Sequence, residues 1–245
     1  MKAPKGKTLI IAARFCGPPE SGNGGYVCGL LAQRLGGKAV EVTLRAPPPL
    51  ERPLQVEPLE DGVRLLDGGR LLAEARPLEL ELEVPKPPSL KNTEMAVTRY
   101  LGFENHPFPS CFVCGPQRAP GDGLRVFAGP LTDGTGVAAP WVPERQLTDD
   151  AGWVKPEFLW ATLDCPGFFA VVGEHVRPLL LGRLTVRLLS RIRPRQPYLV
   201  MGWKIGREGR KHLAGTALFT IPGKLVGMAR AVWIEPRSSG APAPS

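Results

Sequence analysis

A break between two apolar runs brings together residue types that can act on a carbonyl group. Within residues 160–172, the apolar pattern stops at Asp164-Cys-Pro-Gly167 and then resumes. Asp164 stands where a helix N-cap is expected, and Pro166 suits the first helical turn. A carboxylate there can serve as general base or nucleophile. The N–H groups at a helix start can stabilise a developing oxyanion.

A similar arrangement occurs near the start of the chain. In residues 21–32, Asn23 precedes Gly24 and Gly25, and an apolar helical segment follows. These glycines, like Gly167, would let a ligand approach the backbone N–H groups closely. Each polar residue also has a purely structural interpretation: Asp164 as a plain N-cap, and Asn23 as a turn residue beside glycine.

Both segments are part of a longer internal repeat. Thr43 follows Gly25 by 18 residues, and Thr185 follows Gly167 by the same 18 residues. Both threonines lie in segments that alternate with the period of a β-strand. A second pair of matching segments follows in the same order, residues 69–76 and residues 223–230. The chain is therefore predicted to be an internal duplication.

The composition excludes several classes of protein. The 245 residues are 43% apolar, which supports a sizeable core, and the five cysteines are an odd number with no pattern of a disulfide framework. No apolar run reaches the roughly 18 residues that a membrane-spanning helix needs, and no signal peptide is recognised. We expect a soluble, cytoplasmic protein with no membrane partner.

The net charge of +8 makes anionic partners worth considering. One dense basic cluster occurs, Arg187, Arg191, Arg193 and Arg195. No aromatic residue is interleaved with it, which disfavours nucleic-acid binding, because single-strand binders combine basic grooves with stacking aromatics. A small phosphorylated ligand fits the cluster better. A charged strand edge that prevents aggregation is the alternative.

The order of predicted elements is a strand, a helix and several antiparallel strands, repeated twice, which is typical of an α+β fold. We expect an N-terminal unit over residues 1–88, a linker over 89–108, a C-terminal unit over 109–236 and a disordered tail over 237–245. Strands are predicted at 7–15, 39–46, 54–57, 63–66, 70–83, 121–127, 137–142, 182–192, 198–205, 212–220 and 225–234. Helices are predicted up to residue 35, within 91–108 and over 157–172.

Three segments of the second half carry a resemblance to a known family. Residues 163–168, 216–219 and 223–233 resemble segments of hotdog-fold proteins of the thioesterase superfamily. The resemblance covers nearly the whole chain as two hotdogs in tandem. It implies a double hotdog, in which two antiparallel sheets each wrap around a central helix and form a pseudo-dimer. The chain would be monomeric in this form or would pair again as a homodimer.

The resemblance implies binding of acyl-CoA or acyl-carrier thioesters at the seam between the repeats. Hydrolysis would then use Asp164 and Asn23 at the two equivalent positions, with Thr185 orienting water. The glycines at the helix starts would stabilise the oxyanion. The remaining assignments are an acyl slot formed by Phe168 and Trp160, and CoA phosphates bound by Arg191 and Arg193.

The same resemblance leaves other activities open. In one thioesterase branch an Asp works with a Thr and a Gln, but Ala231 stands where the Gln is expected. A non-catalytic hotdog that binds acyl-CoA or acts as an interaction module is therefore the alternative. The Asp-x-Asn-Pro-x-His loop of hotdog hydratases is absent from the sequence.

No cofactor or metal is expected from the sequence. Cys111 and Cys114 form a Cys-x-x-Cys pair with His106 shortly before them, but zinc needs four ligands and no second pair follows. Further ligands would have to come from distant positions, Cys16, Cys28 or Cys165. Buried thiols in a tight turn are the simpler interpretation.

Overall fold

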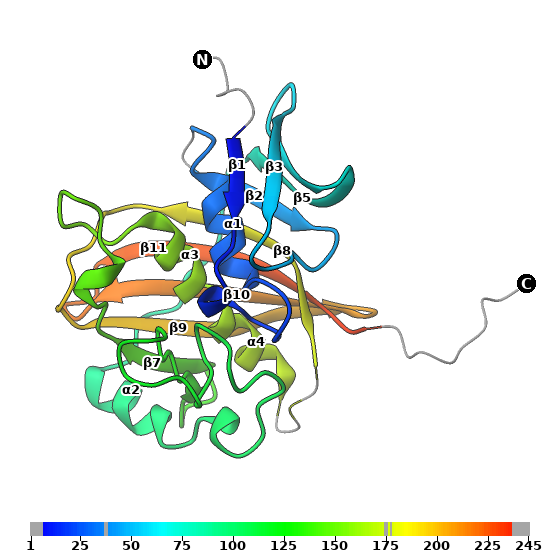
Figure 1. Cartoon of the computed structure of the whole chain (residues 1–245). Coiled ribbons are helices and arrows are strands. Elements are labelled where there is room, and N and C mark those ends of the chain that lie inside the picture. Colours follow the sequence, from blue (N-terminus) through cyan, green and yellow to red (C-terminus); the bar gives the residue numbers. More distant parts are fainter. Residues whose placement is uncertain (1–6, 37–38, 174–175, 177, 237–245) are drawn as a thin grey trace, which may run out of the picture.

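The computed structural model describes residues 7–36, 39–173, 176 and 178–236. In this part of the chain, the strands form one 11-stranded sheet in the order β1-β3-β4-β5-β2-β8-β11-β10-β9-β7-β6. All its strand pairs are antiparallel. Figure 1 shows α1, α3 and α4 gathered in the middle of the molecule. The predicted tail, residues 237–245, lies outside the described residues.

The first half of the chain supplies one helix and five strands. In chain order they are β1 (Lys7–Ile10), α1 (Gly24–Ala32), β2 (Val40–Leu44), β3 (Pro53–Pro58), β4 (Val63–Asp67) and β5 (Arg70–Pro77). Helix α1 contacts β2, β4 and β5, so this half-sheet curls around it. The helix is almost entirely buried, which explains why its sequence is apolar on nearly every side.

The second half repeats this arrangement and adds connecting elements. In chain order they are α2 (Leu90–Val97), β6 (Gly129–Pro130), β7 (Val137–Trp141), α3 (Pro156–Thr162), α4 (Cys165–Val172), β8 (Leu180–Leu188), β9 (Tyr198–Glu208), β10 (Lys211–Thr220) and β11 (Leu225–Ile234). Helix α4 contacts β7, β9 and β10, and α2 packs against β6 and β7.

The strand order confirms the internal duplication. From the outer edge inward, the first half runs β1-β3-β4-β5-β2, and the second half, after β6, runs β7-β9-β10-β11-β8. The strands therefore correspond one to one, and α1 corresponds to α4. The turns before β5 and β11 both contain a glycine with positive φ, Gly69 at 89° and Gly223 at 93°. The predicted α+β class, with a half-sheet wrapped around a helix in each repeat, is confirmed.

The two half-sheets join edge to edge through β2 and β8. The register pairs Val40 with Val186, Glu41 with Thr185, and Val42 with Leu184. The valines and Leu184 are buried. Because side chains alternate across a strand, Glu41 and Thr185 project to the opposite face from their buried neighbours. The seam is thus apolar toward the helices and polar on its other face.

Several predicted boundaries are wrong in informative ways. The helical region expected over 157–172 is two helices, because the chain bends at Asp164 (φ −85°, ψ −72°). The strand expected over 70–83 ends at Pro77, because its partner strand β2 begins at Val40, the residue that pairs with Pro77. No strand forms over residues 121–127. That segment is held instead by backbone hydrogen bonds from Leu124 to Phe112 (2.8 Å) and from Val126 to Val113 (2.9 Å).

Candidate active site

A cavity of about 70 Å³ lies where the two halves meet. Both central helices begin at it: Asn23 precedes α1, and Asp164 precedes α4. The loop after α2 closes another side with His106, Cys111 and Cys114. The rest of the lining is largely apolar and consists of Gly17, Pro18, Phe108, Cys165, Phe168, Leu179, Leu180, Leu181 and Trp233.

Asp164 connects the two repeats. Its side chain is 1% exposed and makes no capping bond to its own helix. Instead, Oδ2 accepts hydrogen bonds from the backbone N–H of Gly25 (2.8 Å) and from Nδ2 of Asn23 (3.3 Å), both at the start of α1. The other oxygen, Oδ1, is buried and has no hydrogen-bond partner in the described part of the chain. The plain N-cap interpretation of Asp164 is therefore wrong.

The environment of Asp164 shifts the pKa of its carboxyl group to near neutral pH. Burial raises the pKa of the carboxyl group to about 7, because the charged form loses its hydration. The Gly25 N–H bond opposes this shift, since it favours the carboxylate. Both protonation states are consequently accessible to this group under ordinary conditions.

Asn23 caps its helix and also faces the cavity. Its Oδ1 accepts a hydrogen bond from the Tyr26 N–H (2.9 Å), which satisfies one free N–H of α1. Its Nδ2 points the other way, toward Asp164 and toward the sulfur atoms of Cys111 and Cys165, each 3.8 Å away. The amide is 3% exposed, so its orientation is fixed from both sides.

The glycines at the helix starts do not serve as free oxyanion donors. The Gly25 N–H is used by Asp164, and the Gly167 N–H donates to the Asp164 carbonyl (3.0 Å). Gly24 lines a neighbouring groove rather than the cavity. Gly25 has a different role, because a Cβ there would lie 2.4 Å from Cβ of Asp164 and 2.9 Å from the carbonyl oxygen of Trp160. It allows α1 to approach the α3–α4 bend closely.

Trp233 has a buried N–H group, its indole Nε1, without a partner among the described residues. The ring lines the cavity from β11 and packs edge-to-face on Phe168, with centroids 5.5 Å apart. The sequence offered no reason to select this residue beyond its place in the segment 223–233. Asp164 and Trp233 thus both line the cavity, and each has a buried polar atom, Oδ1 and Nε1, without a partner among the described residues. The Trp233 Nε1 atom lies beside α4, 3.1 Å from the position that a Cβ of Gly167 would take.

Three cysteine thiols share the cavity wall. The sulfur atoms of Cys111, Cys114 and Cys165 all lie within 4.8 Å of one another, and none forms a disulfide. Hydrogen bonds from the other two thiols lower the pKa of Cys111 well below its usual value, whereas burial raises the pKa of Cys114 and the hydrogen bond with Cys111 raises the pKa of Cys165. His106 Nε2 lies 3.3 Å from Cys114 Sγ. Burial lowers the pKa of His106, so its ring is neutral at pH 7.

Two of the predicted site residues lie elsewhere. Thr185 is buried on the other face of the seam, where its Oγ1 donates to Glu41 Oε2 (3.4 Å). The strand alternation that places Leu184 and Val186 toward the helices turns Thr185 away from them. Trp160 is buried between α1 and α3, where its Cβ and carbonyl oxygen fill the space left by Gly25 and Gly29. Of the predicted acyl-slot residues, Phe168 lines the cavity and Trp160 does not.

The predicted phosphate-binding arginines also lie away from the cavity. The guanidinium carbon of Arg193 lies 3.5 Å from the ring centroid of Trp153, and that of Arg191 lies 4.9 Å away. Arg191 also forms an ion pair with Asp149 (2.6 Å). The arginine cluster thus has an aromatic partner, Trp153 of the loop before α3, which its local sequence did not reveal. These contacts stabilise the loop and give no reason to place a phosphate there.

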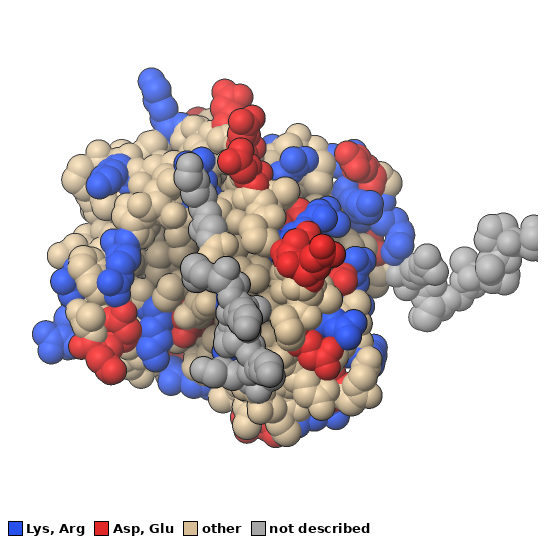
Figure 2. All heavy atoms as spheres, turned by 90° about the horizontal axis from the view of Figure 1, so that it is seen from above, with Lys and Arg blue, Asp and Glu red and all other residues tan. Residues whose placement is uncertain are grey.

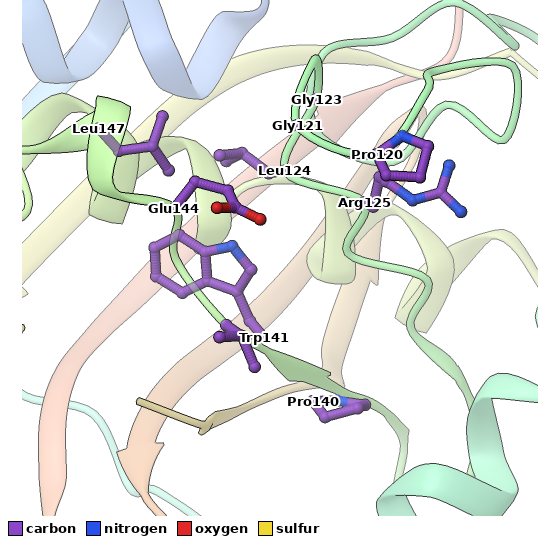
Figure 3. Close-up of a pocket in the computed structure, with 10 residues that line it drawn as sticks. Pro120, Gly121, Gly123, Leu124, Arg125, Pro140, Trp141, Glu144 and Leu147 are labelled. Carbon is purple, nitrogen blue, oxygen red and sulfur yellow. The ribbon is translucent and has the colours of Figure 1, made fainter. Parts of the chain in front are cut away.

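A groove of about 260 Å³ adjoins the cavity and shares Pro18, Leu180 and Leu181 with it. Its lining is mainly apolar but includes Ser21, Arg45, Arg210 and Glu235, and Arg45 forms an ion pair with Glu74 (2.9 Å). A different hollow, of about 240 Å³, lies between the loop at residues 120–125 and β7 and contains Arg125, Trp141 and Glu144 (Figure 3). No side-chain polar atom that lines this hollow is buried without a partner. We therefore place the candidate site in the Asp164 cavity and its groove.

Charges on the surface do not form a single basic patch in the view of Figure 2. On that face, Lys and Arg side chains are interspersed with Asp and Glu. Within the described residues, no helix is both long and apolar enough to cross a membrane.

Solved structures share this architecture along the whole chain. A protein assigned as a thioesterase from Novosphingobium aromaticivorans is 13% identical and superposes with a TM-score of 0.64, over 95% of this chain and 96% of that one. The tesB protein of Mycobacterium avium subs paratuberculosis is 16% identical, with a TM-score of 0.60 over 95% and 93% of the two chains. A conserved hot dog fold protein from Alicyclobacillus acidocaldarius is 12% identical, with a TM-score of 0.55 over 97% and 93%.

These similarities establish the fold. No protein-family model matches the sequence, and no curated protein matches it significantly. The chain has the double-hotdog fold, with both repeats in one polypeptide.

Proposed function

We propose that this double hotdog hydrolyses acyl-CoA or acyl-carrier thioesters in the Asp164 cavity. The observation that carries the proposal is that two residues lining this cavity, Asp164 and Trp233, each have a buried polar atom, Oδ1 and Nε1, without a partner among the described residues. Buried polar atoms normally have partners, and an orphaned pair of opposite character at one cavity indicates a ligand with both an acceptor and a donor. A thioester carbonyl together with a water molecule meets that requirement.

The volume of the cavity fits this pair of ligands. A cavity needs about 10–15 Å³ of such volume to hold one water, so about 70 Å³ admits a water and a carbonyl group but not a whole acyl-CoA. The rest of the substrate would lie in the adjoining groove, whose apolar walls suit an acyl chain or a pantetheine arm. Arg45 and Arg210 in that groove would face the CoA phosphates in place of Arg191 and Arg193.

In the proposed mechanism, Asp164 acts as a general base. A water bound to Oδ1 attacks the thioester carbon while the carboxylate takes up its proton. Negative charge develops on the carbonyl oxygen, and the Trp233 N–H donates a hydrogen bond to it. The tetrahedral intermediate expels the CoA thiolate, which receives the proton, and the carboxylic acid product leaves. Gly25 and Asn23 hold Oδ2, so that Oδ1 keeps its orientation.

The experiment that tests this proposal is thiol release from a panel of acyl-CoAs, short to long, by the purified protein. Turnover that saturates with substrate supports hydrolysis. Ligand-induced thermal stabilisation without turnover on any ester would contradict it and would favour the non-catalytic acyl-CoA binder.

Replacing Trp233 with Phe should lower kcat by about 100-fold, because the indole N–H is lost while most of the ring packing on Phe168 remains. KM should change little, since the lost bond strengthens only as the oxyanion develops. Steady-state kinetics on the best ester of the panel measure both constants. An unchanged kcat would show that Trp233 does not stabilise the oxyanion.

Replacing Arg210 with Gln should raise KM for acyl-CoA several-fold and leave kcat unchanged. Its guanidinium lies in the groove and donates to the Glu235 carbonyl (2.7 Å), where it can also meet a phosphate. The matched control is Arg64→Gln on β4, because Arg64 is an exposed arginine that pairs with Glu57 and neither residue lines the groove. A thioester of N-acetylcysteamine, which lacks the nucleotide, should show no effect of Arg210→Gln. Equal effects on both substrates would contradict the assignment.

A further inference from the structure

Three cysteines that are far apart in sequence converge at one point. Cys111 and Cys114 come from the loop after α2, and Cys165 is the first residue of α4. All three are buried, and their sulfur atoms lie within 4.8 Å of one another. The sequence offered Cys16, Cys28 and Cys165 as distant candidates for a further metal ligand. The fold brings Cys165 to Cys111 and Cys114, and it places Cys16 and Cys28 outside this group.

The distance between two of the sulfur atoms is close to that of tetrahedral metal coordination. With Zn–S bonds of about 2.3 Å, two sulfurs of a tetrahedral site lie about 3.8 Å apart. Cys111 Sγ and Cys165 Sγ are 4.0 Å apart. A disulfide needs about 2.05 Å. At 4.0 Å the two sulfurs are not bonded to each other, and they are close enough to bind the same ion.

Two nitrogen donors also lie near the sulfur atoms. Asn23 Nδ2 lies 3.8 Å from Cys111 and from Cys165, and His106 Nε2 lies 3.3 Å from Cys114. The Phe108 backbone N–H donates to His106 Nδ1 (2.9 Å), which places the ring proton on Nε2. His106 therefore donates to the sulfur and does not serve as a fourth ligand. Such donors stabilise thiolates, the form that binds metals.

We infer that Cys111, Cys114 and Cys165 bind one Zn²⁺ ion as thiolates, with the fourth position of the ion directed at the cavity. The sulfur ligands favour zinc over Mg²⁺ or Ca²⁺, which prefer oxygen. On binding, the thiol protons are released to solvent. The ion would tie the loop after α2 to the start of α4, one residue from Asp164. This inference does not depend on thioester hydrolysis.

The test is the metal content of the full-length protein, purified with a reductant and without chelator. We expect about one Zn²⁺ per chain, with loss of that zinc in Cys111→Ser and Cys165→Ser. The matched control is Cys28→Ala, which removes a buried cysteine of α1 outside the group and should retain the ion. His106→Gln should also retain it, although more weakly.

Two measurements on the unaltered chain keep the test independent of whether the variants fold. Replacing zinc with Co²⁺ should give the intense thiolate-to-metal absorption and the visible bands of a tetrahedral thiolate site. Removing the ion with a strong chelator should release about one Zn²⁺ per chain, which a zinc indicator dye measures.

Three results would overturn the inference. The first is a reduced, folded protein that contains no zinc and takes up none when Zn²⁺ is added. The second is a Co²⁺ complex without thiolate absorption, which would indicate an adventitious surface ion. The third is loss of zinc in His106→Gln as complete as in the cysteine variants, which would make His106 a ligand.

Discussion

Replacing Asp164 with Asn is expected to reduce kcat for thioester hydrolysis by about 10²- to 10⁴-fold, the range that a general base contributes. The amide oxygen can still accept the bonds from Gly25 and Asn23, so the α1–α4 contact should survive. What is lost is the ability of Oδ1 to take a proton from water. Thiol-release kinetics and a thermal melt of the same sample separate this catalytic loss from unfolding.

The control for Asp164→Asn is Glu157→Gln, which changes another buried carboxylate on the neighbouring helix. Glu157 accepts a hydrogen bond from Gln33 Nε2 (2.9 Å) and does not line the cavity. Its substitution should leave kcat within a few-fold of the unaltered protein. Full activity in Asp164→Asn, or an equal loss in both variants, would show that Asp164 is not the base.

Replacing Gly25 with Ala should destabilise the protein by about 3 kcal/mol, because inserting atoms into a packed core costs about 1–3 kcal/mol even before a hydrogen bond is displaced. The new Cβ would lie 2.4 Å from Cβ of Asp164 and 3.0 Å from Cα of Ala161, so α1 must move away from the α3–α4 bend. That movement should also lengthen the hydrogen bond from the Gly25 N–H to Asp164 Oδ2. For a chain of this size, Tm should fall by roughly 6–12 °C, which calorimetry or a dye-based melt can measure.

Gly36→Ala provides the comparison for this variant. Among the described residues, no atom lies within 4 Å of the position that a Cβ of residue 36 would take, and the φ of Gly36 is not in the left-handed region. The substitution should leave Tm within about 2 °C, the effect of about 0.5 kcal/mol. Equal melting temperatures for the two variants would mean that the close helix contact at Gly25 is not a source of stability.

The fold could be predicted from the sequence because the repeat is visible in it. The equal spacing from Gly25 to Thr43 and from Gly167 to Thr185 corresponds to equal distances from a central helix to the seam strand. The break before Gly167 likewise marked the site where α3 meets α4. Asp164, Asn23 and Phe168 were identified from this local pattern, and the structure places all three at one cavity.

The remainder of the site depends on the register between distant strands and on loop conformation, which a single sequence does not reveal. The alternation of apolar and polar residues predicted a strand over residues 183–187, but it did not show which side chains face the helices. In the structure Leu184 and Val186 face the helices, and Thr185 lies on the opposite face of the sheet. Trp233 reaches the cavity through β11. Cys111 lies beside Cys165 because of the conformation of the loop after α2. A backbone hydrogen bond from the Phe112 N–H to the Cys16 carbonyl (2.8 Å) holds that loop in place.

The most direct test of the proposed site is a crystal structure of the Asp164→Asn variant with a non-hydrolysable acyl-CoA analogue. The analogue should replace the thioester sulfur with a methylene group and keep the carbonyl. We expect its carbonyl oxygen within hydrogen-bond distance of Trp233 Nε1, its carbonyl carbon beside residue 164, and its pantetheine arm in the groove that contains Arg45 and Arg210. A carbonyl bound elsewhere, such as in the hollow beside Arg125 and Trp141, would contradict the proposed active site.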